Sequence, residues 1–569
     1  MKLFVFSLAL ALGLLASSLA SAAIVEHTLN VKNLTVERLC NRHVITAVNG
    51  SYPGPTIRVN EGDTLVVHVL NNSPHNITIH WHGIFQLLSG WADGPAYVTQ
   101  CAIRPKHSYT YRFTITGQEG TLWWHAHSSV LRATVYGALL IRPRRSYNYP
   151  FLKPYKEVPI LLGEWWNDDV VELEDKVTST GEGFPPSDAF TINGLPGNLY
   201  NCSQNRMFSL KVMQGKTYLL RIINAAVNTE LFFKIANHKF TVVAVDAGYI
   251  NPYVTDVIVI APGQTADALF TADQPVGSYY MAASPYITQA VPFEDTPTRG
   301  LVVYGGSSNS AAPLMPSMPA FNDTPTAHKF YTNITSLPTK FNPHWHSCPL
   351  SVDEHMFITF SLNLEPCPEN TTCLGFFGQK LSASMNNESF VVPNGRGMSM
   401  LEAFFNGASG VYTADFPDKP PLEFDYTNQN LSFDQSLLFA PKSTKVKKLK
   451  FNSTVEIVLQ NTALLGIENH PIHIHGMNFY VLAQGFGNYN ATRDEAKFNL
   501  VNPQMRNTIA VPVGGWAVVR FKAKNPGIWL VHCHFDVHLP WGMTMAFEIE
   551  NGPTPSSTLP PPPADLPKC

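Results

Sequence analysis

Charged side chains are scarce in this chain. Asp, Glu, Lys and Arg make up 14% of its 569 residues, and the formal net charge is −3. Because a nucleic-acid partner requires a strongly basic surface, this balance predicts that the protein binds no nucleic acid. Long apolar runs are also rare. The one that stands out lies at the N-terminus, so we expect no membrane attachment once that segment is removed.

The N-terminal apolar run covers residues 3–15, follows Met1-Lys2 and precedes Ala20-Ser21-Ala22. A basic start, a short apolar centre and a small-residue cleavage site are typical of a secretory signal peptide. The run is short for a membrane-spanning helix. We therefore predict that residues 1–22 are cleaved and that the mature protein is extracellular. About a dozen Asn-x-Ser/Thr sequons fit a secreted glycoprotein.

Cysteine is scarce as well, with eight in the whole chain, which excludes a disulfide scaffold. Cys367 and Cys373 are close enough in sequence to pair. Cys533 lies among histidines and is assigned to a metal site, so Cys348 remains as a free thiol. The other four could form two long-range bridges, whose pairing the residues alone leave open: Cys40, Cys101, Cys202 and Cys569.

Long helical patterns are few, and 44 prolines and 37 glycines interrupt the chain, which favours short strands. Three segments resemble one another: residues 56–71, 209–224 and 446–461. Each has two alternating apolar runs around a polar turn, a pattern that predicts a strand, a turn and a second strand. Because the chain is too long for one hydrophobic core, we predict an all-β protein of three β-sandwich domains.

The repeat also sets the expected domain boundaries. We predict domains at residues 23–145, 157–306 and 320–551, the third entered through a long connection rich in Pro, Ser and Asn. Residues 552–569 form a Pro-rich tail without a core-forming pattern.

Histidine is concentrated in a few places. One His-x-His pair on a strand merely puts two side chains on one face. Here the repeat places two such pairs in the first domain and two at matching positions in the third. We therefore predict that eight imidazoles form one cage between these domains, able to hold three copper ions. Ten of the 20 histidines lie in four stretches: His80-Trp81-His82, His125-Ala126-His127, His470-Pro471-Ile472-His473-Ile474-His475, and His532-Cys533-His534 with His538.

Two parts of the chain lack a predicted metal site. His344-Trp345-His346 has no counterpart in the repeat, and we interpret it as a surface or linker feature. The middle domain is expected to be a spacer and a wall that faces the substrate. Its residues at the ligand positions are unsuited to a metal: Phe233, Ile235, Ala282 and Ser284.

The run from His532 to Met543 contains the ligands of a second kind of site. Cys533, His538 and Met543 have the ligand types of a blue-copper site, which His470 completes. On a strand, Cys533 points away from both neighbouring histidines, so one strand holds two metal sites back to back. Zinc fits less well, because a structural zinc site uses four ligands in a compact spacing. We expect His538 to offer the exposed edge at which a substrate delivers its electron.

Over nearly all of the mature chain, the sequence resembles the multicopper oxidases, and among them the plant laccases. The four ligand motifs carry the resemblance, together with three further segments: WHGIFQLLSGWADGPA at 81–96, GQEGTLWWH at 117–125 and LPPPPADLPKC at 559–569. The resemblance implies cupredoxin-like Greek-key domains. It also implies the disulfides Cys101–Cys569 and Cys40–Cys202.

The resemblance further implies four copper ions and assigns their ligands. The type 2 ion takes His80 and His473. One type 3 ion takes His82, His125 and His534, and the other His127, His475 and His532. The type 1 ion takes His470, Cys533 and His538, with Met543 as the weak axial ligand.

The implied activity is that of a laccase. Phenols, such as the monolignols of lignin, lose one electron each at the type 1 ion, and four electrons reduce dioxygen to two waters at the other three. We expect a monomer in the plant apoplast or cell wall. The same copper frame also serves oxidases of ascorbate or of metal ions. A non-catalytic cell-wall relative normally lacks ligands, and none is missing here.

Two carboxylates lie close to the ligands in sequence. Asp93 follows His82 by eleven residues, and Asp536 lies between His534 and His538. In oxidases that this chain resembles, acids at these places relay protons or tune the copper cluster. A carboxylate can also simply orient a ligand histidine. The sequence leaves both roles open.

Overall fold

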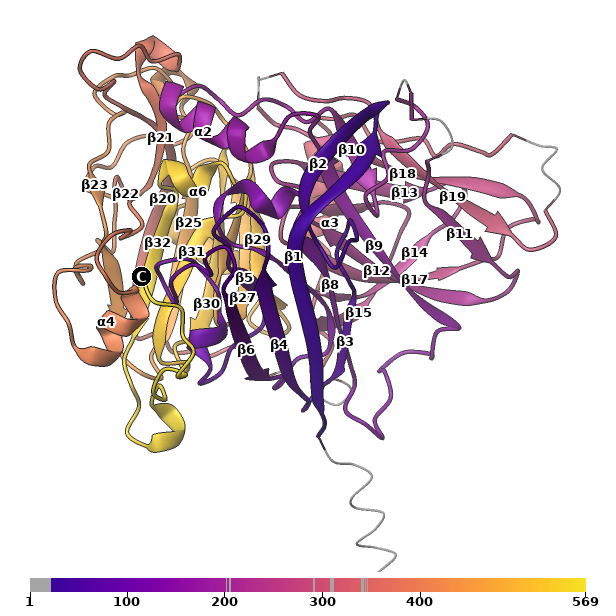
Figure 1. Cartoon of the computed structure of the whole chain (residues 1–569), viewed down its shortest axis with the longest axis horizontal. Helices are drawn as coiled ribbons and strands as arrows, with labels where there is room; N and C mark the ends of the chain where they lie inside the picture. The colour runs from indigo at the N-terminus through magenta and orange to yellow at the C-terminus, as the bar shows by residue number, and fades with distance from the viewer. Residues whose placement is uncertain are drawn as a thin grey trace, which may run out of the picture.

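The computed structural model describes residues 22–200, 202–203, 206–289, 292–307, 312–338, 342, 344 and 346–569. All but the last residue of the predicted signal peptide lies outside these ranges. Among the described helices, none is both long and apolar enough to cross a membrane. Strands dominate and form three successive pairs of sheets, which we call the first, second and third units. Figure 1 shows them in indigo, magenta and orange to yellow.

The first unit has two four-stranded sheets and the 3-10 helices η1 (Gly90–Ala92) and η2 (Ser129–Ala133). In spatial order, one sheet contains β2 (Asn41–Val48), β1 (Ile24–Arg38), β4 (Thr64–Asn71) and β6 (Ser108–Thr114), and the other β3 (Ile57–Asn60), β8 (Tyr136–Arg142), β7 (Gly120–Ala126) and β5 (Ile79–His82).

The second unit has a six-stranded and a five-stranded sheet, with helices α2 (Val170–Thr180) and α3 (Thr324–Thr332). The larger sheet contains β10 (Ala189–Ile192), β9 (Lys156–Trp165), β12 (Thr217–Asn224), β17 (Thr265–Thr271), β14 (Phe240–Val245) and β15 (Gly248–Thr255). The smaller contains β11 (Ser209–Val212), β19 (Thr298–Tyr304), β18 (Ser278–Tyr286), β13 (Glu230–Ile235) and β16 (Ile258–Ile260).

The third unit repeats this plan. Its larger sheet contains β21 (Lys380–Met385), β20 (Glu354–Glu365), β25 (Thr454–Asn461), β30 (Gly515–Lys522), β27 (Phe479–Phe486) and β28 (Gln504–Arg506). The smaller contains β24 (Val446–Leu449), β32 (Thr544–Ile549), β31 (Gly527–Cys533), β26 (His470–Ile474) and β29 (Thr508–Val511). The remaining elements are β22 (Ser389–Phe390), β23 (Lys442–Ser443), α4 (Met400–Asn406), α5 (Ala491–Asp494), α6 (His538–Trp541), η3 (Phe376–Gly378), η4 (Gln429–Leu431), η5 (Glu495–Lys497) and η6 (Pro555–Ser557).

The predicted repeat is confirmed in the strand pairing. Each repeated segment is a strand, a turn and a strand: β3 and β4, β11 and β12, β24 and β25. In each case the two strands enter opposite sheets, where each pairs with a parallel strand of its own unit. Gly62, Gly215 and Asn452 form the turns with φ of 88°, 77° and 67°. Asn replaces Gly in the third turn because it tolerates this left-handed conformation.

Each unit encloses its own apolar core, as the alternating pattern predicts. Trp124 and Tyr111 lie in the first core, and Phe233 stacks on Phe240 across the sheets of the second, with ring centroids 5.8 Å apart. In the third core, Phe521 packs on Phe547 at 5.6 Å. The all-β fold of three sandwich units is thus confirmed.

The disulfides tie the units together. Cys40–Cys202 joins the first unit to the second, Cys101–Cys569 ties the C-terminal tail to the first, and Cys367–Cys373 closes a local loop. These are the pairs that the resemblance and the local spacing imply. Cys348 and Cys533 are free and buried. The tail also docks through Trp91, whose Nε1–H donates to the carbonyl of Pro560 at 2.8 Å.

Candidate metal centres

Four strands carry most of the histidine motifs. His80 on β5 is the cross-strand partner of His125 on β7. In the third unit, His473 on β26 is likewise the partner of His532 on β31. The first and third units therefore present equivalent pairs of strands, and the side chains two residues further along follow the same alternation.

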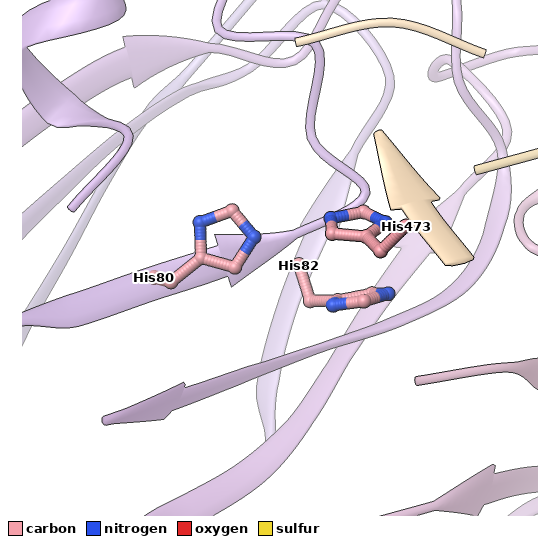
Figure 2. A group of neighbouring side chains, drawn as sticks. All are labelled: His80, His82 and His473. Carbon is pink, nitrogen blue, oxygen red and sulfur yellow. The ribbon is translucent and has the colours of Figure 1, made fainter. Parts of the chain in front are cut away.

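The eight predicted histidines meet between the first and third units. His82 stacks on His473 with ring centroids 3.9 Å apart, and His80 lies 4.1 Å from His475. Figure 2 shows the rings of His80, His82 and His473 close together. Candidate ligand atoms lie within 4.8 Å of one another in three groups: His80, His82 and His473; His82, His125 and His534; and His127, His475 and His532. The last two groups match the two type 3 sets implied by the resemblance.

The nitrogen atoms of these rings fit bound metal ions. The Nδ1–H groups of His80, His125 and His473 donate to backbone carbonyls at 2.7 to 2.8 Å. A carbonyl oxygen can only accept, so each Nε2 carries a lone pair. All three Nε2 atoms are buried and have no hydrogen-bond partner within the described ranges. Buried, electron-donating nitrogens of this kind suit copper.

Burial also keeps the imidazoles uncharged, because it disfavours the protonated form. It lowers the pKa of His532 to about 3. A neutral imidazole is the form that binds a metal. Burial, reinforced by neighbouring charged groups, chiefly the other histidines, lowers the pKa well below its usual value at six other positions: His82, His125, His127, His473, His475 and His534.

A separate group forms around Cys533. Its Sγ lies 3.6 Å from Nδ1 of His470 and 3.4 Å from Nδ1 of His538, and all three side chains are buried. Burial raises the pKa of the Cys533 thiol, so a bound cation is needed to hold it as a thiolate at neutral pH. Two histidines and one cysteine are the strong ligands of a blue-copper site.

The chain turns after β31, so that Met543 lies close to Cys533 and His538 in the backbone. The Cys533 N–H donates to the Met543 carbonyl at 3.1 Å, and the Met543 N–H donates to the His538 carbonyl at 2.9 Å. Gly542 turns the chain with a φ of 110°, where an added Cβ would lie 2.7 Å from the Ala383 carbonyl oxygen. Met543 itself is fully buried. The backbone hydrogen bonds thus hold Met543, the predicted axial ligand, next to both Cys533 and His538.

The exposed edge of His538 is smaller than the sequence led us to expect. His538 is 4% exposed and begins α6, which packs on β21. Its ring packs near those of Phe535 and Trp541, whose centroids are 5.6 and 5.4 Å away. Its Nε2 lies 3.4 Å from Oε1 of Glu468. The prediction assumed an open loop after the strand, whereas a short helix covers the imidazole.

In the middle unit, the strand pairing moves one predicted ligand position by one residue. In β13 and β18, Lys234 is the partner of Ala282, whereas Phe233 is the partner of Ala283. The position equivalent to His80 is therefore Lys234, not Phe233, and Phe233 points into the core. Neither Lys234 nor Ala282 offers an electron pair suited to copper, so the expectation of no metal in this unit is unchanged.

The two candidate carboxylates have different partners. Asp93 is fully buried, and its Oδ2 accepts from Nδ1 of His475 at 2.9 Å. Its Oδ1 lies 3.4 Å from Nδ1 of His80, so one carboxylate touches ligands from both units. Asp536 lies 3.6 Å from Nε of Arg132. Burial raises the pKa of Asp536, and Arg132 opposes that shift.

Asp536 also borders a cavity beside the cage. The cavity has a volume of about 100 Å³ and is lined by His127, His532, Glu174 and Leu539, among others. Asp93 thus contacts two of the predicted ligands directly, and Asp536 faces the cavity beside the cage. Both carboxylates are therefore placed where they could relay protons to the cage or orient its histidines, the two roles that the sequence leaves open.

Several residues that approach the ligands lie outside every motif. Arg132, 2% exposed, contacts the ring of His534 and donates to the Val227 carbonyl at 2.8 Å. Gly263 of the second unit lies against the cage, and Glu468 lies against His538. Only Glu468 had a sequence signal, its place two residues before His470. The other contacts join segments far apart in the chain, which spacing does not reveal.

Gly263 makes a direct test of the cage. A Cβ there would lie 2.9 Å from Cδ2 of His534 and 3.1 Å from Cε1 of His82, at a φ of 89°. We expect Gly263→Ala to slow dioxygen reduction by roughly tenfold or more, because a shift of about 1 Å at reacting groups can cost 100-fold. Stopped-flow reoxidation by dioxygen measures this rate.

The matched control is Gly215→Ala. Gly215 has a φ of 77°, but no atom of the described residues lies within 4 Å of an added Cβ. Both variants strain the backbone, and only one displaces ligands. Equal reoxidation rates in the two variants would contradict the contact.

Comparison with known proteins agrees with this geometry. Three family models described as multicopper oxidase match residues 30–146, 156–307 and 415–553. Laccase-7 of Arabidopsis thaliana is 64% identical to this chain over 99% of both sequences. Laccase-24 of Oryza sativa subsp. japonica is 56% identical, covering 98% of this chain and 97% of its own.

Solved structures show the same fold. The crystal structure of a laccase from Botrytis aclada has a TM-score of 0.72 and 27% identity, covering 95% of this chain and 89% of its own. Fet3p, a multicopper oxidase that functions in iron import, shares the fold at 20% identity with a TM-score of 0.70, covering 95% of this chain and 98% of its own. The similarity to Laccase-7 spans both chains almost completely. The chain therefore belongs to the multicopper oxidase family and, within it, to the laccases.

Proposed function

We propose that this laccase oxidises phenols by one electron at the group of His470, Cys533 and His538 and reduces dioxygen to water at the eight-histidine cage. The observation that carries the proposal is the back-to-back arrangement on β31. Cys533 joins one group of ligands, and its covalent neighbours His532 and His534 join the other. An electron received at the thiol therefore has a through-bond route to the cage.

We further propose four copper ions with the ligands that the resemblance implies. His470, Cys533, His538 and an axial Met543 hold the type 1 ion, and His80 and His473 the type 2 ion. His82, His125 and His534 hold one type 3 ion, and His127, His475 and His532 the other. The units correspond to domains at residues 23–145, 157–306 and 320–551, of which the second holds no metal and forms a wall beside the substrate.

When bound, copper supplies one-electron redox chemistry at the thiolate site and dioxygen binding at the cage. The protein does the rest. Backbone carbonyls hold Nδ1 of His80, His125 and His473, which leaves Nε2 to donate to the metal. The burial of the cage excludes bulk water. Substrate radicals then leave the protein and couple in solution.

Dioxygen reduction also needs protons, and we propose Asp93 and Asp536 as their source at the cage. Asp93 contacts His475 directly, and Asp536 borders the cavity beside His127 and His532. The cavity connects a titratable carboxyl to the ligands without crossing the apolar core. In this role Asp93 both orients imidazoles and passes protons toward the space between them.

Met543 sets the potential of the thiolate site. A weak axial thioether stabilises oxidised copper relative to a side chain that does not coordinate. We expect Met543→Leu, a swap of similar volume, to raise the reduction potential while the blue absorption persists. A redox titration followed by that absorption measures the change, and a lower potential in the variant would contradict the assignment.

We also propose the site of action. The signal sequence at residues 1–22 directs the chain out of the cell, and the sequons are glycosylated during secretion. The extracellular substrates would be monolignols and related phenols of the plant cell wall or apoplast, with the enzyme acting as a monomer. Mass spectrometry of the protein secreted by plant cells tests cleavage, whose expected product begins at Ala23.

Parallel assays separate this function from its alternatives. Purified copper-loaded enzyme is given a phenol, ascorbate and ferrous ion, and dioxygen uptake is recorded for each. The proposal expects the largest kcat/KM with the phenol. Faster turnover of ascorbate or ferrous ion would favour another oxidase of the same frame, and no uptake with any of them would favour a non-catalytic role.

A further inference from the structure

Glu468 is a buried carboxyl group that makes no side-chain hydrogen bond with the described residues. It lies two residues before His470, the first residue of β26, and is 3% exposed. Within the described ranges, neither of its side-chain oxygens has a hydrogen-bond partner. Burying such a group without a partner is costly. This cost suggests that the Glu468 carboxyl group has a function at the groups that it contacts.

The groups that it approaches are the outer nitrogens of the thiolate site. Oε1 of Glu468 lies 3.4 Å from Nε2 of His538 and 3.9 Å from Nε2 of His470. Both rings turn the opposite nitrogen, Nδ1, toward Sγ of Cys533, at 3.4 and 3.6 Å. With Nδ1 donating its electron pair inward, each Nε2 carries the ring proton and faces the carboxyl oxygen.

We propose that Glu468 is a positioning residue that lowers the reduction potential of the thiolate site. The inference rests on the proposed function, in which that site holds the electron-accepting copper ion. A carboxylate behind a ligand imidazole fixes the ring and makes its coordinating nitrogen a stronger donor. A stronger donor favours the more positively charged, oxidised state. Glu468 thus acts through His538 and, more weakly, through His470.

The burial of His538 is related to the position of Glu468. His538 is 4% exposed, so only a small part of its ring is open to an incoming phenol. Glu468 lies against its Nε2. The residue that controls the outer edge of His538 therefore controls how readily the site accepts an electron.

The test compares Glu468→Gln with Glu230→Gln in copper-loaded enzyme. Glu230 is a matched control because it is 1% exposed, and its Oε1 also lacks a hydrogen-bond partner among the described residues. Its Oε2, however, accepts from the hydroxyl of Tyr331 at 3.2 Å. Both substitutions replace a buried carboxyl by an amide of the same shape, but only Glu468 lies against the ligand imidazoles.

The readout is the equilibrium between the enzyme and a one-electron redox buffer, followed by the blue absorption. We expect Glu468→Gln to shift this equilibrium toward the reduced enzyme by about tenfold, the lower end of effects for partners of metal ligands. Glu230→Gln should shift it by much less. The EPR spectrum of the oxidised type 1 ion should change in the first variant and not in the second.

The outcomes are distinguishable. Absence of blue absorption in the unmodified enzyme would sink the proposed function itself. A blue enzyme in which Glu468→Gln shifts the equilibrium no more than Glu230→Gln would overturn only this inference. If Glu468→Gln takes up no copper, Glu468→Asp is measured in the same way. It keeps the carboxylate but withdraws it by one methylene, and it should also shift the equilibrium toward reduction.

Discussion

Replacing Cys533 by Ser is expected to remove the blue absorption and the oxidase activity together. The thiol lies 3.6 and 3.4 Å from the Nδ1 atoms of His470 and His538 and is the only sulfur ligand predicted to bind strongly. A hydroxyl is a harder and poorer partner for copper. The same side chain also begins the covalent route to His532 and His534. We expect phenol oxidation to fall to the level of copper-free protein.

The control is Cys348→Ser. Cys348 is the other free cysteine in the described part of the chain, and it too is buried. Burial raises the pKa of the Cys348 thiol, and its Sγ lies 3.7 Å from the Pro349 carbonyl oxygen. Absorption, copper content and dioxygen uptake should be unchanged. Blue absorption that survived in Cys533→Ser would contradict the assignment of the thiolate ligand.

Replacing Asp93 by Asn is expected to slow reoxidation by dioxygen roughly 10–100-fold, the range for partners of metal ligands. Its carboxylate oxygens lie 2.9 Å from Nδ1 of His475 and 3.4 Å from Nδ1 of His80. Asn keeps the shape but removes the charge and the capacity to carry a proton. The blue absorption should remain, because the Cys533 group lies on the opposite face of β31.

Stopped-flow mixing of reduced enzyme with dioxygen measures this rate. Asp494→Asn is the matched control: Asp494 is also fully buried, but it pairs with Arg493 and Lys497 at α5. The control should reoxidise like the unmodified enzyme. Unchanged reoxidation in Asp93→Asn would sink both the orienting and the relay role of Asp93.

The sequence was sufficient to predict the repeated strands and the relative positions of the histidines. The alternation of apolar and polar residues predicted the repeated strands, because successive side chains of a strand point to opposite faces and only one face is buried. The repeat then placed His80 and His125 in the first domain and His473 and His532 at matching positions in the third, and in the sheets the two members of each pair lie on neighbouring strands. The disulfide Cys101–Cys569 followed only from the resemblance, since sequence alone does not fix pairing over such a separation.

The predictions that were wrong depended on strand pairing and tertiary packing, which the sequence of one segment does not determine. The assignment of Phe233 to a ligand position was off by one residue, and a slip of one residue exchanges the two faces of a strand. The exposure of His538 depended on whether the next residues formed a loop or the helix α6. Arg132 and Gly263 reach the ligands through tertiary packing between units. Such contacts have no sequence spacing to detect.

The central claim is that one electron at a time enters at Cys533 and four leave together at the cage. Its most direct test is the ratio of phenol oxidised to dioxygen consumed by the copper-loaded enzyme, with hydrogen peroxide assayed in the same sample. We expect four phenols per dioxygen and no peroxide. A ratio of two, with peroxide formed, would contradict the account.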